Sequence, residues 1–226
     1  MLVKAKITSG HGDDITDADH MDGVNLFLHS LFQQVDVSLN DVQVSQSAGT
    51  YAYRAYIESL LSYGPQAKTS QFTAALYDKD TAGNMDRSYP DHANAGERNY
   101  GLQKRASFTD RGVTVDMIGR IHSEIFFQDR YMLNKVNVKV RLVRNKVSFR
   151  QMSSKANPSY KVKLISAIFR KVQLSPSVFL AHAIALESEL AKYTAKRVVC
   201  KTYTIPQETW TAITRNCLPV NSRRGS

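Results

Sequence analysis

The stretch VTVDMIGRIHSEIFFQDRYMLNKVNVKVRLVRN, residues 113–145, decides the fold class of this chain. Near its end, apolar residues alternate with polar ones at Val136, Val138, Val140 and Leu142. Because successive side chains of a strand point to opposite faces, this run predicts a half-buried strand. Residues 113–117 repeat the alternation, and Phe126 and Phe127 are large enough to anchor a core between sheets. The stretch therefore predicts an antiparallel sandwich.

Similar patterns place further elements along the chain. Alternation predicts a strand over residues 1–8, a hairpin over 35–44 with its turn at Asn40 and Asp41, and strands over 147–152, 160–174 and 197–205. Helical spacing predicts helices over residues 50–63 and 68–77, and Ser175 with Pro176 predicts the start of a third. Residues 78–100 are expected to form a long exposed loop.

Composition limits the class of protein. The chain has 226 residues, of which 42% are hydrophobic, as is ordinary for a folded protein. Neither a signal peptide nor a membrane span is recognisable, so the protein is expected to be soluble and intracellular. Cys200 and Cys217 form neither a metal-binding pattern nor a disulfide framework, in agreement with a reducing compartment.

The net charge of +10 is unevenly distributed. Residues 1–100 contain 7 Lys and Arg against 13 Asp and Glu, a net charge of −6, whereas residues 101–226 contain 23 against 7, a net charge of +16. The basic residues alternate with apolar ones on predicted strands, which is what the solvated face of a half-buried strand requires. This pattern favours a solvated or subunit-facing sheet surface over a nucleic-acid site.

Candidate metal and catalytic residues are weak. The loop of residues 9–23 has five Asp residues with His11 and His20, but an EF-hand register from Asp17 meets Met21 and Leu28 where oxygen ligands belong. His29 lies in an apolar block and is expected to be a core residue. Asp116, His122, Glu124 and Asp129 lie near Arg120 and Arg130, which favours structural ion pairs. No phosphate loop, nucleophile elbow or metalloprotease motif is present, so we expect no catalytic, cofactor-binding or metal-binding residues and no enzyme activity.

The chain resembles a known family along most of its length. The matching segments, in order, are VNLFLHSLFQQVDVSLND (24–41), TYAYRAYIESLLSYG (50–64), AKTSQFTAALYDKDTAG (67–83), VDMIGRIHSEIFFQDRYMLNKVNVKVRLVR (115–144), NPSYKVKLISAI (157–168), KVQLSPSVFLAHAIALE (171–187) and RVVCKTYTIP (197–206). They are similar to the major capsid proteins of Polinton (Maverick) elements, which are virus-like transposable elements.

The resemblance implies a mainly β fold, the double jelly roll, whose two antiparallel sandwiches carry inserted α-helices. Residues 1–155 would be most of the first jelly roll without its N-terminal strands, and residues 156–226 the start of a truncated second one. The implied function is that of a structural capsid protein, a homotrimer forming pseudo-hexameric capsomers of an icosahedral shell. The expected location is the virion capsid, with assembly in the cytoplasm or nucleus of the host cell.

The resemblance also implies the partners. These would be other copies of the chain and minor or penton capsid proteins, with nucleic acid contacted at most by packaging and no small-molecule substrate or cofactor. Two alternatives remain. A basic nucleic-acid-binding β module would use Lys139, Arg141, Arg144, Lys146 and Arg150. A glycan-binding jelly roll would need clustered histidines and carboxylates, and the scattered positions of His11, His20, His29, His92, His122 and His182 argue against it.

Overall fold

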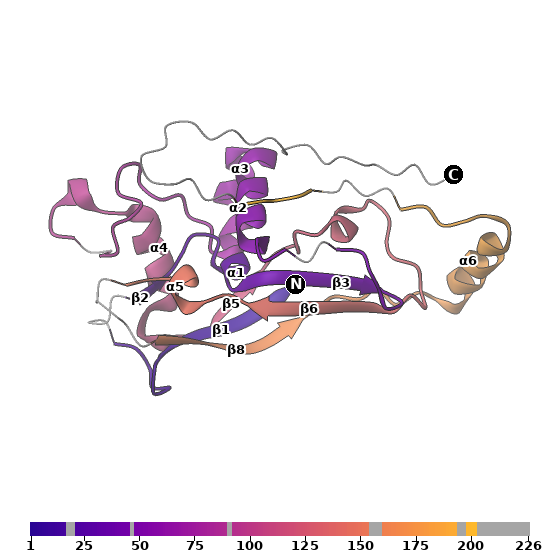
Figure 1. Cartoon of the computed structure of the whole chain (residues 1–226), viewed down its shortest axis with the longest axis horizontal. Helices are drawn as coiled ribbons and strands as arrows, with labels where there is room; N and C mark the ends of the chain where they lie inside the picture. Colours follow the sequence, from indigo (N-terminus) through magenta and orange to yellow (C-terminus); the bar gives the residue numbers. More distant parts are fainter. Residues whose placement is uncertain (17–20, 46–47, 90–91, 154–159, 194–197, 203–226) are drawn as a thin grey trace.

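The computed structural model describes residues 1–16, 21–45, 48–89, 92–153, 160–193 and 198–202 (Figure 1). Its strands are β1 (Leu2–Ser9), β2 (Met21–Gly23), β3 (Phe32–Leu39), β4 (Val42–Gln43), β5 (Val115–Ile118), β6 (Val138–Arg144), β7 (Gln151–Ser153) and β8 (Tyr160–Ile168). Its α-helices are α1 (Phe27–Ser30), α2 (Tyr51–Ser62), α3 (Pro65–Thr69), α4 (Tyr100–Thr109), α5 (Val147–Arg150) and α6 (Pro176–Ser188). Short 3₁₀ turns are η2 (Gln71–Ala75), η3 (Ala95–Glu97), η4 (Asp110–Gly112) and η5 (Glu124–Phe127).

Strands and helices contribute comparably to this fold. About 24% of the described residues lie in strands and about 34% in helices. The expected antiparallel sheets with inserted helices are therefore present. Strands do not predominate, however, because the segments between them fold into more helix than their polar composition indicated.

One sheet has the order β5-β1-β8, and both pairings of β1 are antiparallel. In this register Val3 lies opposite Met117, and Ala5 lies opposite Leu164. The apolar residues of β1 thus meet the apolar residues of its neighbours on one face. The predicted strand over residues 1–8 is confirmed, and its lysines lie on the other face.

A second sheet has the order β4-β3-β6. The predicted hairpin is confirmed, since β3 and β4 pair antiparallel around Asn40 and Asp41. These two residues have φ angles of 47° and 66°, the left-handed conformation that Asn and Asp tolerate best among non-glycine residues and that a tight hairpin requires. The other neighbour of β3 is β6, from the stretch that indicated the sandwich.

The apolar faces of both sheets belong to one hydrophobic core. It contains Val3, Ala5, Ile7, Met117 and Val162 from the first sheet, Val35 and Val37 from β3, and α1 with the buried face of α2. Val140 and Leu142 of β6 pack against its edge. Figure 1 shows β3 and β6 above β1 and β8, with α2 rising over the same core. A two-sheet arrangement is thus what buries the alternating residues.

Some sequence predictions were wrong in detail. Phe126 and Phe127 lie in η5 and are only partly buried, because a 3₁₀ turn at the core margin takes the place of a strand there. Residues 147–152 begin as α5, and only Gln151–Ser153 is strand. The helix predicted over residues 68–77 is divided between α3 and η2, and α4 lies outside the predicted helices.

The C-terminal predictions have mixed outcomes. The helix starting after Ser175 is confirmed as α6. The expected boundary at residue 156 precedes β8, which pairs with β1 from Leu2 to Ser9, so this strand shares a sheet with the first strand. Of the strand predicted over residues 197–205, residues 198–202 are not in a strand, and the others lie outside the described residues.

A fully buried arginine joins α4 to the rest of the fold. Arg105 donates from Nε to the Gly23 carbonyl (3.2 Å), from Nη1 to the Asp78 carbonyl (2.6 Å) and from Nη2 to Asp80 Oδ1 (2.7 Å). Each nitrogen therefore has an acceptor, which a buried guanidinium requires. Arg105 thus fixes α4 against β2 and the loop after η2.

We predict that Arg105→Ala lowers the free energy of unfolding by about 3–5 kcal/mol, because it leaves Asp80 and two carbonyls without their donor. The neighbouring Lys104→Ala is the control, since the exposed Lys104 ammonium pairs only with Asp78 at 2.6 Å and its loss should cost about 1 kcal/mol or less. Urea unfolding measures both variants. Equal losses would show that Arg105 does not have this role.

Candidate functional site

A buried group of polar side chains lies where α2 meets the segment after β5. The ring of His29 approaches that of His122 edge to face, with 4.7 Å between ring centres. His29 Nδ1 lies 3.0 Å from the Tyr51 hydroxyl, which also accepts a 3.4 Å hydrogen bond from the His122 backbone N–H. All three residues are buried. The histidines are thus separated by 93 positions in the sequence but adjacent in space.

The close contact depends on a glycine. A β-carbon at Gly119 would lie 2.7 Å from Leu28 Cδ2 and 3.2 Å from His29 Nε2, so a larger residue would clash with the core. The backbone can therefore pass directly over α1 at this point. That passage brings His122, three residues later, against His29.

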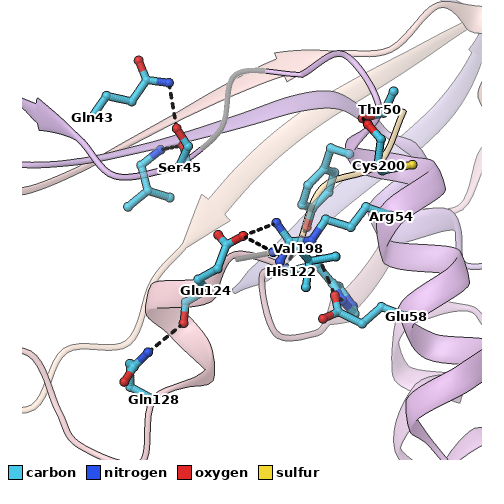
Figure 2. Close-up of polar contacts among 12 residues, drawn as sticks. Gln43, Ser45, Thr50, Arg54, Glu58, His122, Glu124, Gln128, Val198 and Cys200 are labelled. Atoms are coloured by element: carbon cyan, nitrogen blue, oxygen red, sulfur yellow. Dashed lines mark hydrogen bonds and ion pairs between the residues drawn. The ribbon is translucent and has the colours of Figure 1, made fainter. Parts of the chain in front are cut away.

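A chain of ion pairs continues from His122 along α2 (Figure 2). His122 Nδ1 lies 2.8 Å from Glu58 Oε2, Glu58 Oε2 lies 3.7 Å from Arg54 Nε, and Arg54 Nη1 donates to Glu124 Oε1 at 2.9 Å. Tyr51, Arg54 and Glu58 have the spacing i, i+3, i+7, so they lie on one face of α2. These charges therefore bind α2 to the segment that contains His122 and Glu124.

Burial changes the protonation of this group. Burial, reinforced by the nearby His122 and N-terminal amine, holds the pKa of His29 well below its ordinary value of 6.5. Burial also raises the pKa of the Tyr51 hydroxyl. For Glu58, burial alone would raise the pKa, but the hydrogen bond and charge of His122 and the charge of Arg54 together lower it below 4.5. At neutral pH the group therefore contains a neutral His29 and an ionised Glu58.

Residues 198–200 cover the outer side of this group. The Val198 N–H donates to Glu124 Oε1 at 3.2 Å, and the Thr50 hydroxyl donates to the Cys200 carbonyl at 3.2 Å. A cavity of about 30 Å³ lies beneath them, lined among others by Tyr51, Arg54 and Ser123. Side-chain atoms without a hydrogen-bond partner in the described protein lie at or next to this cavity: Arg54 Nε and Nη2, Ser123 Oγ and Glu124 Oε2. The cavity has room for about two water molecules, which can bond to such atoms.

The chemical capacity of this arrangement is limited. A carboxylate bonded to a histidine is a usual general-base pair, but the base must reach a substrate proton. Here His122 is buried, and the adjacent cavity is far smaller than usual small-molecule sites. The geometry therefore fits a network that stabilises the packing of α2.

The sequence placed these residues only in part. His29 is a hydrogen-bonded core residue, as predicted, and Glu124 and His122 form structural ion pairs, although with Arg54 and Glu58 and not with Arg120 or Arg130. Asp116 pairs with Lys4 at 3.1 Å, and Arg120 lies over the Phe127 ring at 5.3 Å. The i, i+4 pair of Arg54 and Glu58 on a predicted helix was a signal for the missing partners.

No group of three or more potential metal ligands occurs among the described residues. Asp17, Asp19 and His20 of the acidic loop lie outside them. Asp14 of that loop pairs with Lys6 at 2.6 Å. The histidines are less scattered than their sequence positions indicated, since His29 and His122 are in contact.

The basic residues named for a nucleic-acid surface do not form one uniform surface. Lys139 and Arg141 lie exposed on β6, with Arg141 opposite Asp36 of β3. Arg144 donates through Nη2 to the Val162 carbonyl. Arg150 is buried, and burial together with the charge of Arg144 lowers its pKa to about 10. Arg144 and Arg150 are thus engaged inside the protein, and Lys139, Arg141 and Lys146 remain exposed.

The comparisons with known proteins give one distant relative. No protein-family model matches the chain, and no solved structure matches it. The chain is similar to an uncharacterized protein of Caenorhabditis elegans, with 27% identity over 128 residues that cover 56% of this chain and 26% of that protein. The match thus spans about a quarter of the relative. Within the described part of the chain, every helix is too short or too polar to cross a membrane.

We predict that the protein loses stability as the pH falls from 7 to 5. The pKa of His29 is lower in the folded than in the unfolded chain, so below 6.5 the unfolded state binds more protons and becomes favoured. The loss approaches about 1.4 kcal/mol per pH unit, and Glu58 contributes only below about pH 4.5, where its depressed pKa begins to matter.

Urea unfolding at pH 7.0, 6.0 and 5.0 measures this dependence. His29→Gln, which can still bond to Tyr51, should show a flatter dependence than the wild type. His182→Gln on the exposed α6 is the control and should retain the wild-type dependence. An unchanged dependence in His29→Gln would contradict the assignment to His29.

Proposed function

We propose that this chain is a structural capsid subunit of the double jelly-roll type, similar to the major capsid proteins of Polinton (Maverick) elements. In this proposal it forms homotrimers that act as pseudo-hexameric capsomers of an icosahedral shell. Its partners are other copies of itself and minor or penton capsid proteins, its location is the virion capsid, and it catalyses no reaction.

The observation that carries the proposal is the pairing of distant strands. β1 lies between β5 and β8, which follow it by more than 100 residues, and β3 pairs with β6, so both sheets join early and late segments. Such antiparallel pairing in two sheets around one core is typical of jelly rolls and not of hairpin meanders. This pattern supports, but is coarser than, the jelly-roll assignment.

The surface gives further support. Large apolar side chains are exposed on α2, on α6 and at the ends of β5 and β8 (Ile118 and Ile168), although the core is well packed. Exposed apolar area of this extent is typical of proteins that bind other proteins. The small buried cavity and the internally paired His122 and Glu58 favour a structural over an enzymatic function.

A second candidate function is nucleic-acid binding through Lys139, Arg141 and Lys146, which are exposed in a part of the chain with net charge +16. Affinity for single-stranded DNA that falls steeply with salt, and that Lys139→Ala with Arg141→Ala reduces, would favour it. We prefer the capsid function, because Arg144 and Arg150 have contacts inside the fold.

We predict that the purified chain forms discrete trimers or larger shell-like particles. Light scattering coupled to size-exclusion chromatography gives the mass of each species, and negative-stain electron microscopy shows whether the largest fraction contains closed particles. The physical reason is that assembly removes the exposed apolar side chains from water. A monomer at all concentrations tested would contradict the proposed function.

A further inference from the structure

Helix α6 is apolar and exposed on all sides. Its sequence PSVFLAHAIALES contains one charged residue, Glu187, and none of its residues is buried. Leu180 and Ile184 are 61% and 59% exposed and lie one turn apart on the same face. A helix that is apolar on all sides is normally covered by protein. The exposure of α6 therefore indicates a binding partner.

The position of α6 leaves one face open. Lys135 Nζ lies 5.0 Å from the ring centre of Phe179, and Tyr193, just after α6, donates to the Tyr131 carbonyl and accepts from the Leu133 N–H, both at 3.1 Å. These contacts hold the Phe179 side of the helix toward residues 131–135. Leu180 and Ile184 lie about 100–140° around the helix from Phe179, so they point away from these contacts.

A second apolar stripe lies on α2. Ile57, Leu60 and Leu61 have the spacing i, i+3, i+4 and are 47%, 39% and 81% exposed. The buried face of the same helix is formed by Tyr51, Ala55 and Ser59, so the stripe belongs to the opposite side. Figure 1 shows α2 above the middle of the sheets and α6 beyond the end of β3 and β6. The two helices therefore do not cover each other within one chain.

We propose that α6 of one copy packs its Leu180–Ile184 face against the Ile57, Leu60 and Leu61 stripe of α2 in a second copy. This inference rests on the proposed function, since it names the contact by which subunits associate. Both surfaces have side chains spaced by three and four residues, the ridges that pack between helices. A contact between two different surfaces repeats from copy to copy and can close into a ring, as a trimer requires.

The charge distribution favours a second copy as the partner. α2 belongs to residues 1–100, with net charge −6, and α6 belongs to residues 101–226, with net charge +16. A contact between α2 of one copy and α6 of another brings the oppositely charged parts of two chains together, which favours their association and sets its orientation. A contact between two copies of α6 would instead bring the basic parts together.

Two double variants test the contact. Leu180→Asp with Ile184→Asp alters α6, and Ile57→Asp with Leu61→Asp alters α2; all four residues are exposed, so folding should be retained, which circular dichroism and urea unfolding check. Each variant alone should associate at least about 100-fold more weakly than the wild type and be monomeric. His182→Asp, also exposed on α6 but on another face, is the control and should keep the wild-type oligomer.

An equimolar mixture of the two variants gives the sharpest result. One intact α6 and one intact α2 stripe remain between them, so light scattering should show a one-to-one dimer and no larger species. Variants that keep the wild-type oligomer would overturn this contact while leaving the proposed self-assembly intact. Loss of the oligomer in the α6 variant alone would also overturn it, because α2 would then not be the partner. A wild-type monomer would overturn both proposals.

Discussion

The pairing of β1 with two late strands is the constraint from which the architecture follows. β5 and β8 occupy both edges of β1, and their register places Val3, Ala5 and Ile7 in the core. A shift by one residue would turn these side chains toward water and bury Lys4 and Lys6. Because this sheet joins the two ends of the described chain, the segments between β1 and β8 must fold back over its apolar face.

Polar groups then connect what the sheets leave apart. Arg105 holds α4 against β2, and the series of contacts from His29 through His122 to Glu124 holds α2 against the segment after β5. Such networks stabilise a single arrangement only when their buried groups are paired. Most atoms of this network are, and the unpartnered ones lie at or beside a cavity that can admit water.

The exposed helices relate the fold to its proposed function. The core is packed from inward faces of both sheets, yet α2 and α6 keep apolar stripes on the surface. Their exposure cannot be explained by folding of the single chain, since burial of those side chains would favour a more compact arrangement. Association with further copies accounts for these surfaces and for the opposite charges of the two parts of the chain, without requiring a catalytic site.

The sequence by itself determined the local elements whose period is unambiguous. The alternation in β1 and β6, the Asn40 and Asp41 turn, and the start of α6 at Pro176 each follow from a short-range rule. Only the tertiary structure decided which side of α2 is buried. Its small and polar face packs against the core, whereas Ile57 and Leu61 lie outside, because helical spacing does not say which face meets a neighbour. The contact of His29 with His122 was likewise invisible in the sequence, since it depends on the passage of the chain at Gly119 over α1.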